Sequence, residues 1–190
     1  MDEAVLRAAV AALVGGRRYS IVDAVEIVPD LAGLYAVYGD GEAQAQLALG
    51  SFDAPLYVGK AERSLASRDV RTHFASGKTG SSTLRRSVAA LLRSELDLHA
   101  VPRNLALPDG SANFALEPHG DQRLTEWMQA RLQLAFWVRP DGAVLDKVET
   151  AVLNRLAPPL NLMKMGPRGN RRVKAERAVL VAEARAWSKA

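Results

Sequence analysis

Three short segments rich in aromatic and β-branched residues limit most strongly what this chain can fold into. They span 33–38 (GLYAVY), 56–58 (LYV) and 132–138 (LQLAFWV), and a glycine or a Pro-Asp-Gly turn follows each of them. Such residues favour the pleated, half-buried surface of a sheet, so each segment predicts a short strand. Helical patterns separate the three segments, so we expect an α+β fold.

The helical patterns lie at 2–14, 64–75, 82–96, 122–130, 145–156 and 172–187. The fifth is the clearest, because Leu145, Val148, Val152 and Leu156 recur at near-helical spacing and Pro158-Pro159 follows. Residues 19–28 fit either a strand or a short helix, as do residues 42–49. The stretch 100–120 is rich in proline and glycine, which predicts loops with one hairpin.

These patterns divide the chain into a helical extension (1–29), one globular core (30–165) and a basic helical arm (166–190). The net charge of +4 over 190 residues is only mildly basic. Its distribution is more informative, because the basic residues gather in two segments that can frame one nucleic-acid-binding face. The first holds Lys60, Arg63, Arg68, Arg71, Lys78, Arg85, Arg86 and Arg93, and the second holds Lys164, Arg168, Arg171, Arg172, Lys174 and Arg177.

Several classes of protein are excluded by what the sequence lacks. It has no cysteine, so disulfides and cysteine-ligated zinc are ruled out. It shows neither a basic, apolar signal peptide at its start nor an apolar run of membrane-spanning length, so we expect a cytoplasmic protein with no membrane partner. The Gly-rich stretch 77–83 lacks the order of a phosphate-binding loop, so we expect no nucleotide cofactor.

Three separated motifs carry residues suited to phosphodiester chemistry. The first comprises Gly33-Leu34-Tyr35 and Tyr57-Val58-Gly59, the second an arginine-bearing helix at 64–75, and the third Glu149 followed by Pro158-Pro159-Leu160-Asn161. Hydrolysis needs an activated water, a group that holds the phosphate and a cation at the leaving oxygen. Arginine matches phosphate oxygens, and one or two carboxylates suffice to hold Mg²⁺. A tyrosine can act as a base only where nearby cations lower its pKa.

In this order, the motifs resemble the GIY-YIG nuclease superfamily over about 33–161, in a restriction-enzyme-like or an uncharacterised bacterial branch. The resemblance implies a small three-stranded antiparallel sheet flanked by helices, here with an extra N-terminal helix and a basic C-terminal helix. It implies a metal-dependent endonuclease that cuts DNA by in-line attack of water and leaves 5′-phosphate and 3′-hydroxyl ends. The expected cofactor is one Mg²⁺ or Mn²⁺ per site, and the expected substrate is double-stranded DNA. A restriction-type enzyme with one such core would cut both strands as a homodimer.

The resemblance also assigns roles to residues. Tyr35 is similar to the base of the family, directly or through His73, and Tyr57 to the tyrosine that positions the water. Arg68 resembles the arginine that holds the scissile phosphate, Glu149 the metal ligand and Asn161 the asparagine that orders the site. Further contacts to nucleic acid are expected from Gly59, Lys60, Arg71, Lys78, Arg85, Lys164, Arg171 and Arg172.

The sequence departs from the family pattern in two places. The spacing from Tyr35 to Tyr57 exceeds the usual one, which predicts an insertion at 39–54. The helix arginine falls one residue late, which leaves Arg71 as a competitor of Arg68 for the scissile phosphate.

Two alternative functions, from other classes of protein, remain open. A binding module with the same fold but no turnover would use the basic segments equally well and would have no need of Glu149. A structural or toxin–antitoxin partner protein would use its last helix as the contact.

Overall fold

The computed structural model describes residues 2–50, 53–66, 73–106, 113–166 and 169–187. Its centre is a four-stranded antiparallel sheet in the order β1-β6-β2-β3. The strands are β1 (Tyr19–Ser20), β2 (Gly33–Gly39), β3 (Tyr57–Ala61) and β6 (Leu132–Val138). A second antiparallel pair joins β4 (Ala100–Pro102) to β5 (Phe114–Leu116), within the stretch where one hairpin was expected.

The α+β class and the three predicted strands are confirmed, but the prediction of a three-stranded sheet was wrong by one strand. The additional strand, β1, lies at the start of the ambiguous stretch 19–28 and pairs with Gln133 and Leu134 of β6. A strand of two residues is too short to show an alternating pattern, so the sequence could not distinguish it from the helix that follows.

Helices fill the rest of the described chain. They are α1 (Glu3–Val10), continued by the π-helical turn η1 (Ala11–Gly15), α2 (Ile21–Ile27), α3 (Gly41–Leu47), α4 (Thr83–Leu92), α5 (Pro118–Arg131), α6 (Leu145–Leu156) and α7 (Arg171–Ala186). Helix α3 resolves the ambiguity at 42–49. Half of the helix expected at 64–75, residues 67–72, falls outside the described residues. Within the described ranges, no helix combines the length and the apolar character needed to cross a bilayer.

Short polar side chains fix where several helices begin. Asp2, Ser20, Asp40, Ser82 and Asn170 each accept a hydrogen bond from a backbone N–H in the first turn of the helix that follows. The first N–H groups of a helix have no partner inside it, so such caps stabilise the start by about 1 kcal/mol each. The helix α4, which begins after Ser82, is the one that matters most for the site.

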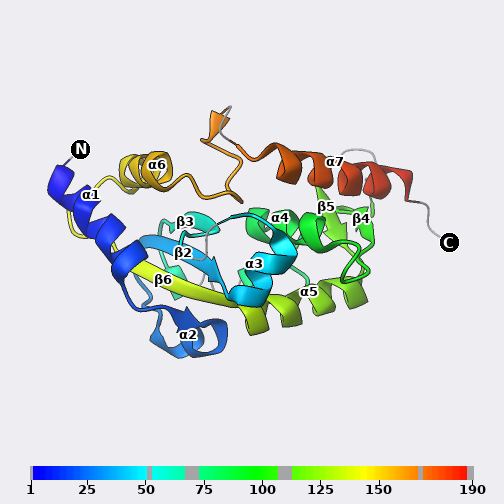
Figure 1. Cartoon of the computed structure of the whole chain (residues 1–190), viewed down its shortest axis with the longest axis horizontal. Coiled ribbons are helices and arrows are strands. Elements are labelled where there is room, and N and C mark those ends of the chain that lie inside the picture. The colour runs from blue at the N-terminus through cyan, green and yellow to red at the C-terminus, as the bar shows by residue number, and fades with distance from the viewer. Residues whose placement is uncertain (1, 51–52, 67–72, 107–112, 167–168, 188–190) are drawn as a thin grey trace.

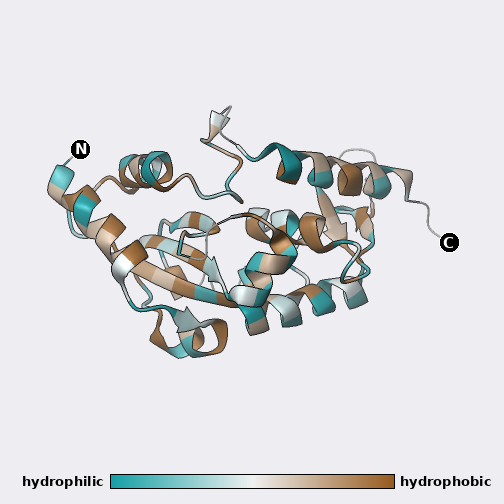
Figure 2. Cartoon of the chain, in the orientation of Figure 1, coloured by the Kyte–Doolittle hydropathy of each residue, from teal (hydrophilic) through white to brown (hydrophobic). Residues whose placement is uncertain are grey.

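The two faces of the sheet enter two separate cores, because successive side chains of a strand point to opposite faces. Tyr35 and Val37 pack into a core shared with α2, α3, α4, α5 and α7. Leu34, Ala36 and Tyr38 pack into a second core with α1, η1 and α6. In Figure 1, α1 and α6 lie near the N-terminus, and the C-terminus lies at the opposite end of the molecule, after α7. Figure 2 shows the apolar central strands and the hydrophilic first turn of α7.

Candidate active site

A buried chain of three polar side chains starts in the middle of the sheet. The Tyr35 hydroxyl on β2 lies 2.5 Å from Nε2 of His73, and Nδ1 of His73 lies 2.6 Å from Oγ of Ser82. The side chains of Tyr35, His73 and Ser82 are fully buried, at 0% exposure. Buried polar groups need hydrogen-bond partners, and here the His73 imidazole is the partner of both the Tyr35 hydroxyl and the Ser82 hydroxyl that caps α4.

Gly59 makes room for this arrangement. It lies directly opposite Tyr35 in the β2–β3 register, and a Cβ at this position would collide with the Tyr35 ring and hydroxyl. Any larger residue would therefore displace the tyrosine. Gly59, which was expected to contact nucleic acid, lines the cleft, and its lack of a side chain leaves room for the Tyr35 ring beside β3.

A cleft of about 790 Å³ opens beside these strands. It gathers predicted site residues that are far apart in the sequence, among them Tyr35, Tyr57, Gly59, Lys60, Glu149, Asn161 and Lys164. His73 is not among the lining residues and lies behind Tyr35. Among the described residues, Tyr35 therefore lies between the cleft and His73.

Asn161 attaches the segment after α6 to the edge of the sheet. Its Oδ1 accepts from the N–H of Val58 at 2.9 Å, and its Nδ2 donates to the carbonyl of Val58 at 2.7 Å. One residue earlier, the N–H of Leu160 donates to the carbonyl of Leu56 at 2.9 Å. The asparagine thus satisfies backbone groups of an edge strand that would otherwise be buried without partners.

Glu149 lies on α6, at the wall of the cleft, with only 9% of its surface exposed. The Lys164 ammonium donates to Oε2 of Glu149 at 2.7 Å and to Oδ1 of Asp146 at 2.6 Å. The Lys60 ammonium lies 2.8 Å from the same oxygen of Asp146 and 4.0 Å from Oε2 of Glu149. Lys60 also pairs with Glu62 at 3.0 Å, so three carboxylates and two ammonium groups form one cluster at the cleft.

The cluster sets the ionisation of its members. Hydrogen bonds from Lys164 and then from Lys60 lower the pKa of Asp146 to about 2. Hydrogen bonds to Asp146 and Glu62 raise the pKa of Lys60. Burial lowers the pKa of Lys164, but its hydrogen bonds to Asp146 and Glu149, with their charges, outweigh this effect and raise it. Sequence reasoning missed Asp146, although its position three residues before Glu149 places both on one helix face.

The donor set at this cluster fits a small divalent cation. Carboxylate oxygens are the ligands that Mg²⁺ and Mn²⁺ prefer, and Glu149 presents its carboxylate to the cleft. Within the part of the chain that the structure describes, no three acidic or histidine side chains converge as a closed metal cage. An ion held by one or two carboxylates, with water completing its coordination, is the arrangement that this geometry allows.

The prediction that Arg85 contacts nucleic acid was wrong. Its side chain is fully buried, and Nη2 forms an ion pair with Oδ2 of Asp121 at 2.9 Å. Its Nη1 donates to the carbonyl of His73 at 3.1 Å, so Arg85 supports the backbone of the buried chain. The sequence did carry a signal, because Arg85 precedes Val88, Ala89 and Leu92 at helical spacing and so lies on the apolar face of α4.

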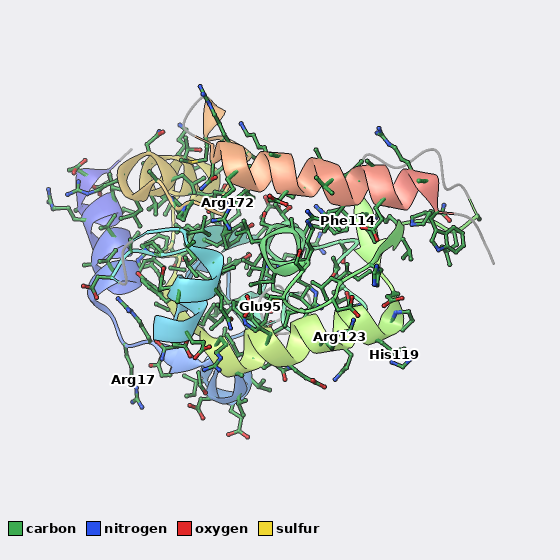
Figure 3. The ribbon with its side chains drawn as sticks, turned by 45° about the vertical axis from the view of Figure 1, so that its right-hand side comes forward. Arg17, Glu95, Phe114, His119, Arg123 and Arg172 are labelled. Atoms are coloured by element: carbon green, nitrogen blue, oxygen red, sulfur yellow. The ribbon has the colours of Figure 1, made fainter. Side chains whose placement is uncertain are left out.

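The other predicted basic contacts differ in their surroundings. Lys78 and Arg171 are exposed. Arg172, at the start of α7 (Figure 3), donates to the carbonyls of Leu47 and Ala48 at the end of α3. Arg68 and Arg71, the two candidates for the scissile phosphate, lie outside the described residues.

Arg86 adds positive charge beside Tyr57. It is 7% exposed, and it donates to the carbonyls of Thr79 and Gly80 at 3.2 and 2.8 Å. Burial, and after it the charges of Arg177 and Arg103, lower the pKa of Arg86 to about 10, while the charge of Tyr57 opposes them. Arg86 and Arg177 belong to the two basic segments of the sequence, but their place beside Tyr57 depends on how α4 and α7 pack.

The chain matches a known protein family over most of its length. The family model of the GIY-YIG catalytic domain matches residues 51–178, well over half of the chain. The match includes Tyr57, Glu149 and Asn161 and begins after Tyr35. No curated protein and no solved structure matches the chain. On the extent of the family match, this chain belongs to the GIY-YIG catalytic domain family.

Proposed function

We propose that this protein is a metal-dependent endonuclease that hydrolyses phosphodiester bonds of double-stranded DNA by in-line attack of water. The products would carry 5′-phosphate and 3′-hydroxyl ends. The observation that carries the proposal is the single cleft that Tyr35, Glu149 and Asn161 line together, with His73 hydrogen-bonded behind Tyr35. Membership of a nuclease family supports the same reaction class.

Activation of water falls to Tyr35 with the help of His73. In the tautomer with a proton on Nδ1, His73 donates to Oγ of Ser82 and leaves Nε2 free to accept the Tyr35 proton. Tyr35 can then take a proton from water in the cleft while it passes its own to His73. His73 acts through Tyr35, since Tyr35 lines the cleft and His73 does not.

Other residues would bind the phosphate and stabilise the leaving group. We assign Arg68 to the scissile phosphate and Arg71 to a neighbouring one, in keeping with the family resemblance. Glu149 would hold Mg²⁺ or Mn²⁺, which when bound stabilises the charge that develops on the leaving 3′-oxygen. Tyr57 lines the same cleft and would orient the attacking water. Asn161 keeps this wall of the cleft attached to β3.

The binding face that we propose uses the exposed and cleft-lining cations. Lys60, Lys78, Lys164, Arg171 and Arg172 remain candidates for phosphate contacts, and Arg85 no longer does. The nuclease core would comprise 30–165, with 1–29 and 166–190 as extensions. Two copies would be needed to cut both strands of a duplex at one position.

Cleavage of supercoiled plasmid with Mg²⁺ or Mn²⁺ tests the proposal, with wild type, Arg68→Ala and Glu149→Ala in parallel. We expect nicked or linear product from wild type that DNA ligase can reseal, and none from either variant or with EDTA. Ends that carry a 3′-phosphate would contradict the proposed chemistry. Tight, metal-independent DNA binding without cleavage, retained by both variants, would favour the binding module instead.

A further inference from the structure

One lysine lies between the carboxylates of Asp146 and Glu149. The Lys164 ammonium lies 2.6 Å from Oδ1 of Asp146 and 2.7 Å from Oε2 of Glu149. It also donates to Oγ1 of Thr150 at 3.4 Å. The Lys164 ammonium therefore bridges two acidic side chains with nearly equal contacts, and the Lys60 ammonium lies beside the same two groups, at 2.8 Å from Asp146 and 4.0 Å from Glu149.

The backbone at Lys164 is held in an unusual conformation. Its φ of 62° lies in the left-handed region, where a residue with a Cβ is strained. Such strain persists only where the surroundings impose it, and it gathers at functional sites. Here it accompanies a side chain that turns back to α6, fifteen residues earlier in the chain. Lys164, which bridges Asp146 and Glu149, thus belongs to the segment that Asn161 attaches to β3.

Asp146 and Glu149 are placed so that both side chains could bind one ion. They lie three residues apart on α6, so both side chains extend from the same face of the helix. Glu149 lines the cleft, and Asp146 lies at its rim, where it contacts the lining residues Lys60 and Lys164. Mg²⁺ typically binds one or two protein carboxylates and keeps several waters. Asp146 and Glu149 could therefore supply all of its protein ligands.

We propose that Asp146 is a second carboxylate ligand of the divalent ion, and that the Lys164 ammonium occupies the ion's place until the ion displaces it. This rests on the proposed function, because it assumes that Glu149 holds the metal. A divalent ion carries twice the charge of an ammonium group and approaches carboxylate oxygens more closely, so it competes for the same oxygens. Lys164 is exposed and flexible enough to leave toward solvent or toward a phosphate in the cleft.

Mn²⁺ binding to the DNA-free protein, measured by isothermal titration calorimetry, tests the proposal without reference to cleavage. The variants are Glu149→Gln, Asp146→Asn, Lys164→Met and the double variant Asp146→Asn/Lys164→Met. Glu62→Gln is the matched control, because Glu62 lines the cleft and contacts Lys60 at 3.0 Å without touching Lys164. Thermal melting of each variant checks that it is folded.

We expect Lys164→Met to bind Mn²⁺ roughly tenfold more tightly than wild type, because a competing charge is gone. Asp146→Asn should bind about tenfold or more weakly, both alone and in the Lys164→Met background. In the double variant Asp146 cannot act by restraining Lys164, and the same comparison in an added Lys60→Met background excludes an effect through Lys60, which lies 2.8 Å from Asp146. Glu62→Gln should leave the affinity unchanged.

Three outcomes would overturn the inference. The first is equal Mn²⁺ affinity of Lys164→Met and the double variant, with binding lost in Glu149→Gln; this would leave the proposed function standing. The second is no gain of affinity in Lys164→Met. The third is unchanged binding in Glu149→Gln, which would remove the metal site of the proposed function as well.

Discussion

The Tyr35 hydroxyl has a partner that can take its proton, and this is the residue-scale basis of the proposed chemistry. Its neighbour, His73, is in turn held by Ser82, whose hydroxyl also accepts from the N–H of Arg85 at 3.1 Å to cap α4. One side chain therefore begins a helix and orients an imidazole. These two tasks can be separated by substitution.

Ser82→Gly should lower the cleavage rate by about tenfold or more, because it removes the contact that orients His73. Stability should fall by about 1–2 kcal/mol, because His73 loses a buried hydrogen bond; the lost cap itself costs only roughly a few tenths of a kcal/mol, since glycine is tolerated at the start of a helix. Single-turnover cleavage and urea unfolding measure the two effects.

Ser82→Thr is the matched control, because it keeps a hydroxyl at the same position and should retain both properties. Nitrogen-15 NMR of His73 should show the Nδ1-protonated tautomer in wild type and in Ser82→Thr, and a mixture in Ser82→Gly. A Ser82→Gly variant with full activity would remove Ser82 from the relay.

At the scale of elements, the site depends on how α6 and the segment after it meet the edge of the sheet. Helix α6 ends at Ala157 in a left-handed conformation, and Pro158-Pro159 prevents its continuation. The chain then runs along β3, where Leu160 and Asn161 bond to Leu56 and Val58. This path brings Glu149, Asn161 and Lys164 to one wall of the cleft.

Asn161→Ala should lower the free energy of unfolding by about 1–3 kcal/mol, because it leaves the N–H and carbonyl of Val58 buried without partners. Asn161→Asp should not restore stability, since a carboxylate oxygen would then face the Val58 carbonyl. Urea unfolding measures both. Asn104→Ala is the control, because Asn104 is exposed and, within the described residues, accepts a hydrogen bond from the N–H of Ala106. Equal stability of Asn161→Ala and wild type would contradict this role.

Elements with a long, clear hydrophobic period, and motifs in a fixed order, could be predicted from the sequence. Helix α6 was predicted at its observed bounds, and the central strands β2, β3 and β6 were identified. The gathering of Tyr35, Tyr57, Glu149 and Asn161 in one cleft followed from the order of the motifs. Strand β1 was missed because two residues show no period.

Contacts between distant segments could not be predicted from the sequence, because no local residue pattern encodes them. The contact of Ser82 with His73, and the bridge from Lys164 to Asp146 and Glu149, depend on how loops fold back on α4 and α6. The burial of Arg85 could have been inferred from its helical phase, but its basic character suggested a surface role instead.

At the scale of the whole molecule, a buried ion pair joins α4 to α5 behind the site. Asp121 accepts from Arg85, Thr79 and the backbone N–H of Gly77, and Arg85 also donates to Thr125. Burial lowers the pKa of Arg85, and Asp121 opposes the shift. This network fixes one end of the large core, to which the Tyr35 face of the sheet belongs.

Asp121→Ala should destabilise the protein by about 3–5 kcal/mol, because it leaves the Arg85 charge buried without its partner. Glu176→Gln is the comparison, since it removes the half-exposed pair with Arg93 and should cost no more than about 1 kcal/mol. Urea unfolding of both variants measures the contrast. Similar losses in the two would show that the buried pair has no special role.

The stereochemical course at phosphorus tests most directly whether Tyr35 activates water rather than attacking the phosphate itself. A DNA substrate with a chiral phosphorothioate at the scissile position would be cleaved in ¹⁸O-water. A single in-line displacement by water inverts the configuration at phosphorus, and the proposed mechanism predicts inversion. Retention of configuration, or a covalent Tyr35–DNA adduct, would contradict it by showing two successive displacements.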